Sequence, residues 1–542
     1  MIDVVGVDSS ISSRCGIHGE NGLRLRSHAP AILACAFVPL FGLLILVRGH
    51  DADWDFLNYH WYNAYAWLTG RRGFDVAVAH HATYYNPLAD VPVYVAAHVL
   101  PAWSIIFLVG FVHGLNLLLL YRLARAALPA QSGSSGDWLA LALAVAGTTG
   151  GMVLMIVGNT SNDMTMSLLV LLALLWMVRA AQSDTDELLR YGAAGLAGGV
   201  AVGLKLTMAP FAIGLAIGAL ALRAPWQIRL RRVAMLGVGG AVGAAIFGGI
   251  WAYTLWRETG NPFFPYFNDV IGSPLILDAS YRDQRFLPRG VLETLVYPFL
   301  FTWDGTKVND IPFRDIKVAL VYAIVPLTVL WAAITRRQLT QSMRLLFTVS
   351  AVSYAAWLSV FGVYRYVLTL EMLAPLLIAL ALSLWPLTEP RRFGALAVLW
   401  GLALLCTSWI DIGAIGGKWR DTYVDVGVPP LADPDHTLVV MAGVEPMGYI
   451  VPSFPPQIPF LRIDGWLDTP SSHSPFGDRM RARIDGHEGP IFGVFIEWER
   501  IRAIAAFAAD GLVPAGPDCA TIRSNVGPPL SWCALQRKAS AP

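Results

Sequence analysis

Long apolar runs recur along the chain and alternate with shorter polar segments. A helix needs roughly twenty apolar residues to cross the hydrocarbon core of a membrane, and most of these runs approach that length. We therefore predict a mainly α-helical, polytopic membrane protein with about eleven transmembrane helices. The predicted spans are residues 30–48, 102–121, 138–157, 164–180, 190–205, 207–222, 233–256, 318–334, 345–361, 366–385 and 393–410.

Arginines occupy every second short connection between these spans. They follow the second span at Arg122 and Arg125, the sixth within residues 223–232, and the tenth at Arg391 and Arg392. Short connections rich in Lys and Arg stay on the cytoplasmic side of a membrane. This pattern places the N-terminus in the cytoplasm, and an odd number of spans then places the C-terminal residues outside.

Three polar segments on the outer side are long enough to carry structure of their own. The sequence is accordingly divided into a cytoplasmic N-terminal segment at 1–29, a transmembrane module at 30–410 with outer loops 49–101 and 257–317, and an extracytoplasmic C-terminal domain at 411–542.

The C-terminal segment has the pattern of a small α/β domain. Apolar runs at 437–440 and 491–496 predict strands, and residues 499–509 predict a helix. Cys519 and Cys533 both lie here. Outside the cytoplasm the two can form a disulfide, and two free thiols are the alternative.

Composition supports the membrane assignment. Hydrophobic residues make up 55% of the chain and charged residues 14%, and the mean hydropathy is +0.53. Soluble domains carry roughly 25% charged residues. The net charge is +1, and without a basic stripe there is no reason to expect a nucleic-acid partner.

Three aspartates follow the first span within the run HDADWDFLNYH. These are Asp51, Asp53 and Asp55. Helix capping explains one such aspartate but not three. A carboxylate shielded by Trp54 and Tyr59 at a membrane face is expected to have a raised pKa and to serve as a general base. The cluster is therefore a candidate for a general base or a metal ligand.

A helix is expected to begin near Asp55 and to cover residues 56–68 as an amphipathic stretch, with Asp53 or Asp55 as its N-cap. Residues three and four positions apart share a helix face. Asn58 and Tyr59 should therefore stand beside Asp55.

Two cationic positions lie next to apolar spans. Lys205, in the run GLKLT, interrupts an apolar stretch of about thirty residues. A lysine at this depth is either functional or reaches back to the interface. Arg365 lies between Tyr364 and Tyr366 at the start of a span. It either binds a phosphate bidentately or anchors the helix.

Other motifs are weaker on their own. Asn86 and Pro87 are typical of a helix start, and the turn ending in Asn162 and Asp163 could be an ordinary capped loop. The run GNPFFPY at 260–266 predicts a rigid aromatic turn. No phosphate-binding glycine motif, HExxH motif or zinc-type cysteine spacing is present in the sequence.

The order of these motifs resembles that of the GT-C superfamily of membrane glycosyltransferases, which includes protein O-mannosyltransferases and lipid A aminoarabinose transferases. The resemblance extends over nearly the whole chain. It rests on an acidic motif after the first span, a Pro-Leu helix start, an Asn-Asp before the fourth span, GLKLT, NPFFP after the seventh span, an Arg-Tyr late in the chain and a C-terminal extracytoplasmic domain.

The resemblance implies transfer of a sugar from a polyprenyl-phosphate donor to an acceptor hydroxyl, with inversion, on the outer face of a bacterial inner membrane. It implies that Asp55 is the base, that Asp53 is its partner or a metal ligand, and that Lys205 and Arg365 hold the donor phosphate. The family commonly has an Asp-Glu pair where this chain has Asp-Trp-Asp. Which aspartate is the base, and whether a divalent metal takes part, therefore stay open.

The remaining pocket residues are assigned by their neighbourhood. Tyr364 and Tyr366 would flank the phosphate, and His60 is either a partner of the acidic motif or an interfacial histidine. The acceptor is a glycolipid, a polysaccharide or a protein, and membrane lipids are further partners. A flippase or transporter for lipid-linked glycans and an oligosaccharide ligase are the alternative functions.

Overall fold

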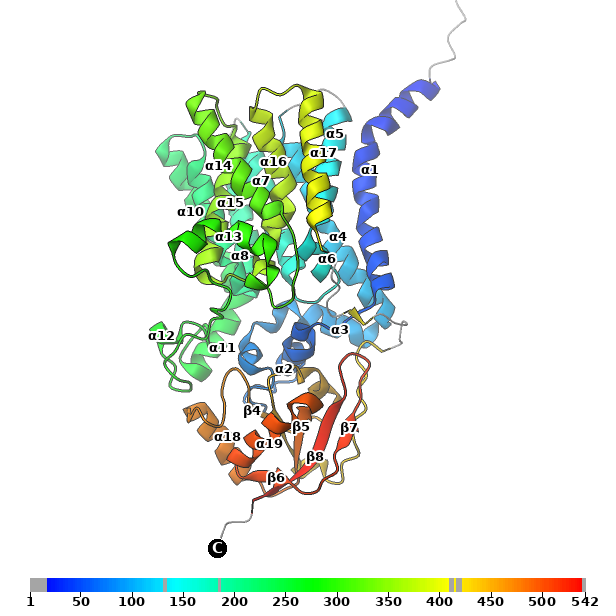
Figure 1. Ribbon diagram of the computed structural model, residues 1–542, viewed down its shortest axis with the longest axis vertical. Helices are drawn as coiled ribbons and strands as arrows, with labels where there is room; N and C mark the ends of the chain where they lie inside the picture. Colours follow the sequence, from blue (N-terminus) through cyan, green and yellow to red (C-terminus); the bar gives the residue numbers. More distant parts are fainter. Residues whose placement is uncertain (1–16, 130–133, 184–186, 409–413, 416–421, 539–542) are drawn as a thin grey trace, which may run out of the picture.

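The computed structural model describes residues 17–129, 134–183, 187–408, 414–415 and 422–538. Most apolar helices pack side by side in one bundle, and a sheet with its own helices lies at one end of it (Figure 1). Within the described residues, seven helical segments are long and apolar enough to cross a membrane, and four shorter apolar helices accompany them. The chain is therefore a multi-pass membrane protein.

Each of the eleven predicted spans coincides with helical structure. The helices are α1 (Ile17–Arg48), α4 (Ala102–Ala127), α5 (Ser134–Gly147), α6 (Gly151–Ile156), α7 (Asp163–Ala181), α8 (Leu188–Leu204), α9 (Ala209–Ala221), α10 (Trp226–Ala244), α11 (Ile250–Thr259), α14 (Lys317–Ile334), α15 (Gln341–Val360), α16 (Leu368–Leu384) and α17 (Glu389–Cys406). A π-helical turn at Ala245–Gly249 joins α10 to α11.

Two features of the bundle differ from the prediction. The third predicted span is broken, because α5 ends at Gly147 and α6 begins at Gly151. The segment 257–317 contains the short helix α12 (Asn268–Ile271) and the apolar helix α13 (Val291–Trp303), and the latter was not predicted. At thirteen residues α13 is too short to be recognised as a span by length.

The segment 49–101 begins with β1 (His50–Asp51), followed by the π-helical turn Phe56–His60, which continues directly into α2 (Trp61–Leu68). The rest is the 3-10 turns His80–Tyr84 and Pro87–Ala89, and α3 (Val91–Val99). The predicted helix at 56–68 is confirmed, but its expected amphipathic exposure is not found, because every residue from Phe56 to Ala66 is buried. The C-terminal domain covers the remaining face. A Cβ on Gly448 would lie 2.1 Å from the carbonyl oxygen of Asn58.

The C-terminal domain is a mixed sheet packed with two helices. Its strand order is β4-β3-β5-β8-β6, with β7 also paired to β8. β3 is parallel to β4 and β5, and β8 is antiparallel to its neighbours. This confirms the α/β fold class. The elements are β3 (Leu438–Ala442), β4 (Phe460–Asp464), α18 (Pro475–Asp485), β5 (Ile491–Ile496), α19 (Arg500–Ala509), β6 (Leu512–Pro514), β7 (Ala520–Ile522) and β8 (Leu530–Arg537).

Strand pairings are among the contacts that tie the domain to the rest of the chain. Val76, from the 49–101 segment, bridges to Leu461 at the free edge of β4. β1 pairs with β2 (Ala414–Ile415) just before the domain. In Figure 1 the helices α2 and α3 accordingly lie between the bundle and the sheet.

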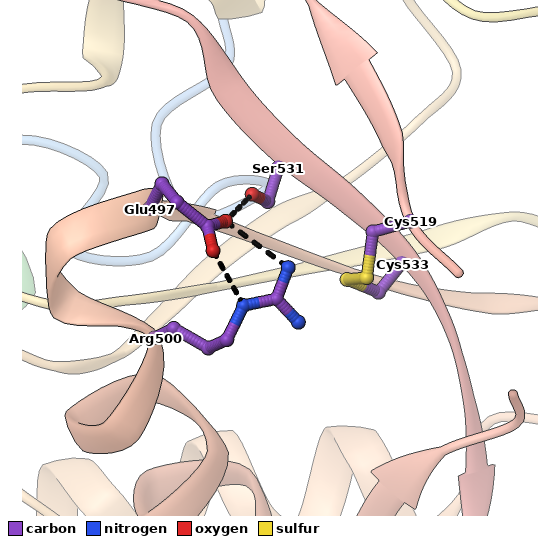
Figure 2. Close-up of a disulfide and its surroundings, with 5 residues drawn as sticks. All are labelled: Glu497, Arg500, Cys519, Ser531 and Cys533. Atoms are coloured by element: carbon purple, nitrogen blue, oxygen red, sulfur yellow. Dashed lines mark hydrogen bonds and ion pairs between the residues drawn. A yellow bond between two sulfur atoms is a disulfide. The ribbon is translucent and has the colours of Figure 1, made fainter. Parts of the chain in front are cut away.

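A disulfide joins Cys519 to Cys533 inside this domain (Figure 2). Antiparallel pairing of β7 with β8 sets Ala520 opposite Trp532, which brings the two cysteines together. Beside the bridge, Glu497 accepts hydrogen bonds from Ser531 and Arg500.

Candidate active site

The loop that carries Asp51, Asp53 and Asp55 is fixed by the end of α1. The guanidinium of Arg48 donates to the carbonyl oxygens of Leu154, Met155 and Val157 at 2.7, 2.8 and 3.0 Å. These carbonyls lie at the end of α6, where a short helix leaves its last acceptors unsatisfied. The contact holds the three aspartates next to the loop that connects α6 to α7.

Asp51 is held by that loop. Its Oδ2 accepts from the backbone N–H and the hydroxyl of Thr160, at 2.7 and 2.8 Å. The side chain is buried, and burial raises the pKa of Asp51. We assign it to positioning the loop.

Asp53 is the N-cap of the helix. Its Oδ1 accepts from the backbone N–H of Phe56 at 2.7 Å, and its Oδ2 accepts from Nδ2 of Asn159 at 3.1 Å. Burial, and then the charges of Asp51 and Asp55, raise the pKa of Asp53 to about 8. Asp53 therefore holds its proton at neutral pH more readily than an ordinary aspartate.

Asp55 has a different environment from its two neighbours. Its Oδ2 lies 2.6 Å from Nη1 of Arg365 and accepts from the hydroxyl of Tyr59 at 3.3 Å. Burial alone would raise the pKa of Asp55, but the charges of Arg365, His60 and Lys205 outweigh it and lower the pKa. The raised pKa that was predicted for a shielded carboxylate of this cluster is therefore found at Asp53 and not at Asp55, because Arg365 contacts Asp55 from far along the chain.

A second carboxylate joins Arg365 to Lys205. Nζ of Lys205 lies 2.7 Å from Oδ1 of Asp163 and donates to the carbonyl of Ser161 at 2.6 Å. Nε of Arg365 lies 3.9 Å from Oδ2 of Asp163. We call the series Asp55–Arg365–Asp163–Lys205 the carboxylate–cation chain. The side chain of Asp163 is fully buried, whereas those of Lys205 and Arg365 are 15% and 24% exposed, so an anion could reach the cations.

Breaks between helices position the charged side chains of Lys205, Asp163 and Arg365. Lys205 is the extended residue between α8 and the 3-10 turn Leu206–Met208. Asp163 begins α7, and Arg365 lies in the 3-10 turn Tyr364–Val367 before α16. All three charged residues therefore lie at the ends of helices, where their surroundings are less apolar than in the middle of the bundle.

The three predicted tyrosines take different positions. Tyr59 bonds Asp55, and the ring of Tyr366 stands beside both cations, 5.5 Å from Arg365 and 5.6 Å from Lys205. Tyr364 points away. It is fully buried against Phe301 and Phe313, so the predicted phosphate contact of Tyr364 is wrong.

His60 and Asn162 meet at a third carboxylate, that of Asp90. Nδ1 of His60 and Nδ2 of Asn162 lie 2.7 and 2.6 Å from Oδ1 of Asp90. Burial alone would lower the pKa of His60, but Asp90 outweighs it and raises the pKa. His60 therefore adds positive charge close to Asp55 without touching it.

The amides of Asn58 and Asn86 both donate to backbone carbonyls. Nδ2 of Asn58 donates to the carbonyl of Ala79 at 3.3 Å. Nδ2 of Asn86 donates to the carbonyl of Gly203 at 2.8 Å, two residues before Lys205. Asn86 thus supports the helix break that carries the lysine.

The acidic motif does not fit a divalent metal in this arrangement. Both carboxylate oxygens of Asp53 already accept hydrogen bonds, and Asp55 faces a guanidinium. In the part of the chain that the structure describes, no three His, Cys, Asp or Glu side chains are grouped to hold a metal ion.

Sequence reasoning missed an aromatic group beside the acidic motif. The indole of Trp54 stacks on that of Trp466, with ring centres 4.9 Å apart. His80 and His81 also stack on Trp466, at 5.5 and 6.0 Å. No local signal could have linked Trp466 to the 49–101 segment, because the contact crosses about four hundred residues.

Solved structures resemble this fold. ArnT from Cupriavidus metallidurans in the apo state aligns over 93% of this chain and 97% of its own, with a TM-score of 0.53 and 14% identity. The same protein bound to undecaprenyl phosphate gives a TM-score of 0.45 at 18% identity, over 70% of this chain and only 64% of that one. The Archaeoglobus fulgidus oligosaccharyltransferase in the apo form gives 0.47 at 13% identity, over 88% and 71%.

We base the fold assignment on the apo ArnT comparison. The chain has the GT-C fold that the order of its motifs predicted. No protein-family model matches the chain, and no curated protein matches its sequence.

Proposed function

We propose that the protein is an inverting glycosyltransferase that moves a sugar from a polyprenyl-phosphate donor to an acceptor hydroxyl. The observation that carries this proposal is the carboxylate–cation chain. It sets a carboxylate, Asp55, directly against a partly exposed cation, Arg365, and Asp163 links Arg365 to a second partly exposed cation, Lys205. A glycosyl phosphate needs both groups, a cation for its leaving oxygen and a base for the attacking hydroxyl.

Lys205 and Arg365 bind the donor phosphate in this proposal. The phosphate takes the place of Asp55 on Nη1 of Arg365, which now shares its charge with the new anion. Asp55 loses part of the attraction that lowers its pKa, so it becomes a better proton acceptor when the donor is bound. Asp163 stays buried and keeps the two cations in place.

The transfer then needs one concerted displacement. The carboxylate of Asp55 accepts the proton of the acceptor hydroxyl, and the hydroxyl oxygen forms a bond to the anomeric carbon of the sugar. The bond from that carbon to the phosphate oxygen breaks, and its electron pair leaves with the polyprenyl phosphate. Attack from the face opposite the phosphate inverts the anomeric configuration.

The proposed location is the outer side of a bacterial inner membrane, with the N-terminus in the cytoplasm. Disulfides persist in oxidising compartments and are rare in the cytosol. The Cys519–Cys533 bridge supports placing the C-terminal domain outside, and the arginine-rich connections support the same orientation.

Lipid binding tests the proposed donor site. The full-length protein in detergent is titrated with undecaprenyl phosphate and, as a control, with undecaprenol. We expect the phosphate to be essential for tight binding, and Lys205→Ala to weaken it about tenfold, which is ~1.4 kcal/mol. The matched variant Lys307→Ala removes a lysine paired with Glu293 in the 257–317 segment and should bind as wild type.

Two results would count against the site. Equal affinity for the phosphate and the alcohol would mean that no group recognises the phosphate. Equal losses of lipid affinity in Lys205→Ala and Lys307→Ala would mean that Lys205 is not specific for the phosphate. Lys205 would then be an interfacial anchor.

A further inference from the structure

Trp466 is a large, exposed aromatic side chain beside the acidic motif. It follows β4 in the C-terminal domain, and 48% of its surface is exposed. Its indole stacks on Trp54, which lies between Asp53 and Asp55 in the chain, with ring planes 17° apart. We call Trp54, His80, His81 and Trp466 the aromatic platform.

The platform is built to hold Trp466 in place. The backbone N–H of Trp466 donates to Nδ1 of His80 at 3.3 Å. Gly465 permits this contact, because a Cβ at that position would lie 2.1 Å from the same nitrogen. His80 in turn is buried and contacts Nη1 of Arg462. A solvent-facing tryptophan with no binding role has no need of such a support.

The platform is uncharged. Burial lowers the pKa of His80 well below its usual value and that of His81 to about 4, so both imidazoles are neutral at physiological pH. They stack on Trp466, whose exposed indole presents a flat π face that carries a partial negative charge.

Two carboxylates, those of Asp55 and Asp283, lie close enough to this apolar surface for their charges to act on His81. Asp283 is exposed in the 257–317 segment, and both of its oxygens accept hydrogen bonds from Arg285. A carboxylate accepts hydrogen bonds from hydroxyl groups. Flat aromatic faces bordered by carboxylates match a pyranose ring, whose C–H face is weakly positive and whose edge carries hydroxyls.

Aromatic rings also connect the platform with the proposed base. His81 lies 5.8 Å from Tyr85, and Tyr85 lies 5.2 Å from Tyr59, whose hydroxyl bonds Asp55. Tyr266, in the 257–317 segment, stacks on Tyr85 and hydrogen-bonds it. All three polar segments of the chain therefore contribute to one wall, which runs from Trp466 to Asp55.

From this arrangement we infer that the acceptor is a carbohydrate, and that one of its sugar rings stacks on Trp466. Asp55 contacts Arg365, one of the two cations proposed to bind the phosphate, and its neighbour Trp54 belongs to the platform. The base thus lies between a donor site in the bundle and an acceptor site formed with the C-terminal domain. This inference rests on the proposed function, because it takes Asp55 as the base.

Carbohydrate binding tests the inference without turnover. The full-length protein in detergent is applied to an array of defined bacterial oligosaccharides, with peptides printed as a second class of probe. We expect wild type to bind oligosaccharides, Trp466→Ala to lose at least tenfold in affinity, and Trp466→Phe to keep most of it because it retains a π face. Trp498→Ala removes a 66% exposed tryptophan of the same domain and should bind as wild type.

Undecaprenyl phosphate binding by the same proteins separates this inference from the proposed function. Trp466→Ala should bind the lipid as wild type, which also shows that it is folded. No oligosaccharide binding by wild type, binding to peptides alone, or equal binding by Trp466→Ala and wild type would overturn the carbohydrate acceptor and leave the lipid result intact. Loss of lipid recognition in wild type would instead overturn the donor site.

Discussion

Asp53 and Asp55 are two residues apart and have opposite electrostatic environments. Asp53 caps a helix, and burial and then the neighbouring carboxylates raise its pKa to about 8. Asp55 is buried too, but Arg365 and other cations hold its pKa low. At neutral pH, Asp55 is therefore the ionised carboxylate of the pair, and Asp53 is largely neutral.

The pKa of Asp53 makes stability depend on pH. The folded protein keeps the proton of Asp53 up to about pH 8, whereas an unfolded aspartate loses it near pH 4. Between these values the folded state binds more protons, so the free energy of unfolding falls as the pH rises, by up to about 1.4 kcal/mol per pH unit.

We expect Asp53→Asn to remove this contribution, because asparagine does not ionise. Thermal unfolding of both proteins in detergent at pH 5 and pH 8 measures it. Wild type should lose more stability than the variant over this range. If the stabilities of wild type and variant differ by the same amount at pH 5 and at pH 8, the raised pKa of Asp53 is contradicted.

Sequence alone identified the members of the site better than their partners. The acidic motif, Lys205 and Arg365 stand out because each places charge beside an apolar span. The Asp55–Arg365 contact could not be predicted, since it joins residues about three hundred positions apart. For the same reason the sequence could not tell which aspartate has the raised pKa.

At the scale of elements, α8 and α10 pack with their backbones almost in contact. A Cβ on Gly199 of α8 would lie 2.0 Å from the carbonyl oxygen of Gly240 on α10. Small residues at an interface allow this approach in membranes, where helix association depends on packing and not on the hydrophobic effect. The pair supports the end of α8, and therefore the position of Lys205.

Gly199→Ala should destabilise the bundle, because the new methyl group meets rigid backbone. Overpacking of this kind typically costs about 1–3 kcal/mol. Gly240→Ala is the matched control, since its Cβ would meet nothing nearer than the carbonyl oxygen of Gly195 at 3.6 Å. Thermal unfolding in detergent should show a lower melting temperature for Gly199→Ala only, and equal melting temperatures would contradict the packing.

Hydrophobic periodicity predicted the helices well but not their irregularities. Each predicted span coincides with helical structure, because twenty apolar residues leave few alternatives to a transmembrane helix. The break between α5 and α6 was missed, and the burial of Phe56–Ala66 depends on contacts with segments far along the chain, such as that of Asn58 with Gly448. Such contacts leave no local pattern.

At the scale of the whole molecule, the C-terminal domain closes over the 49–101 segment and adds Trp466 to the acidic motif. This assembly needs the domain and the aspartates on the same side of the membrane. The disulfide in the domain supports the proposal that this side faces an oxidising compartment.

The compartment can be tested with the cysteines of the native protein. Non-reducing mass spectrometry of membranes should find the peptides of Cys519 and Cys533 linked, while Cys35 and Cys406, which are free and exposed, react with a thiol reagent once the membrane is dissolved. Free thiols at Cys519 and Cys533 would place the domain in a reducing compartment and contradict the orientation.

The most direct test of the proposed function is the glycan profile of cells that carry Asp55→Asn. General-base catalysis is typically worth about 10²–10⁴-fold in rate, so cells with the variant should lack one glycosylated envelope product. The variant protein itself should be made in normal amounts and should still bind undecaprenyl phosphate. Asp269→Asn, an exposed acid in α12, should leave every product unchanged. Identical envelope glycans in wild type and Asp55→Asn would contradict the account.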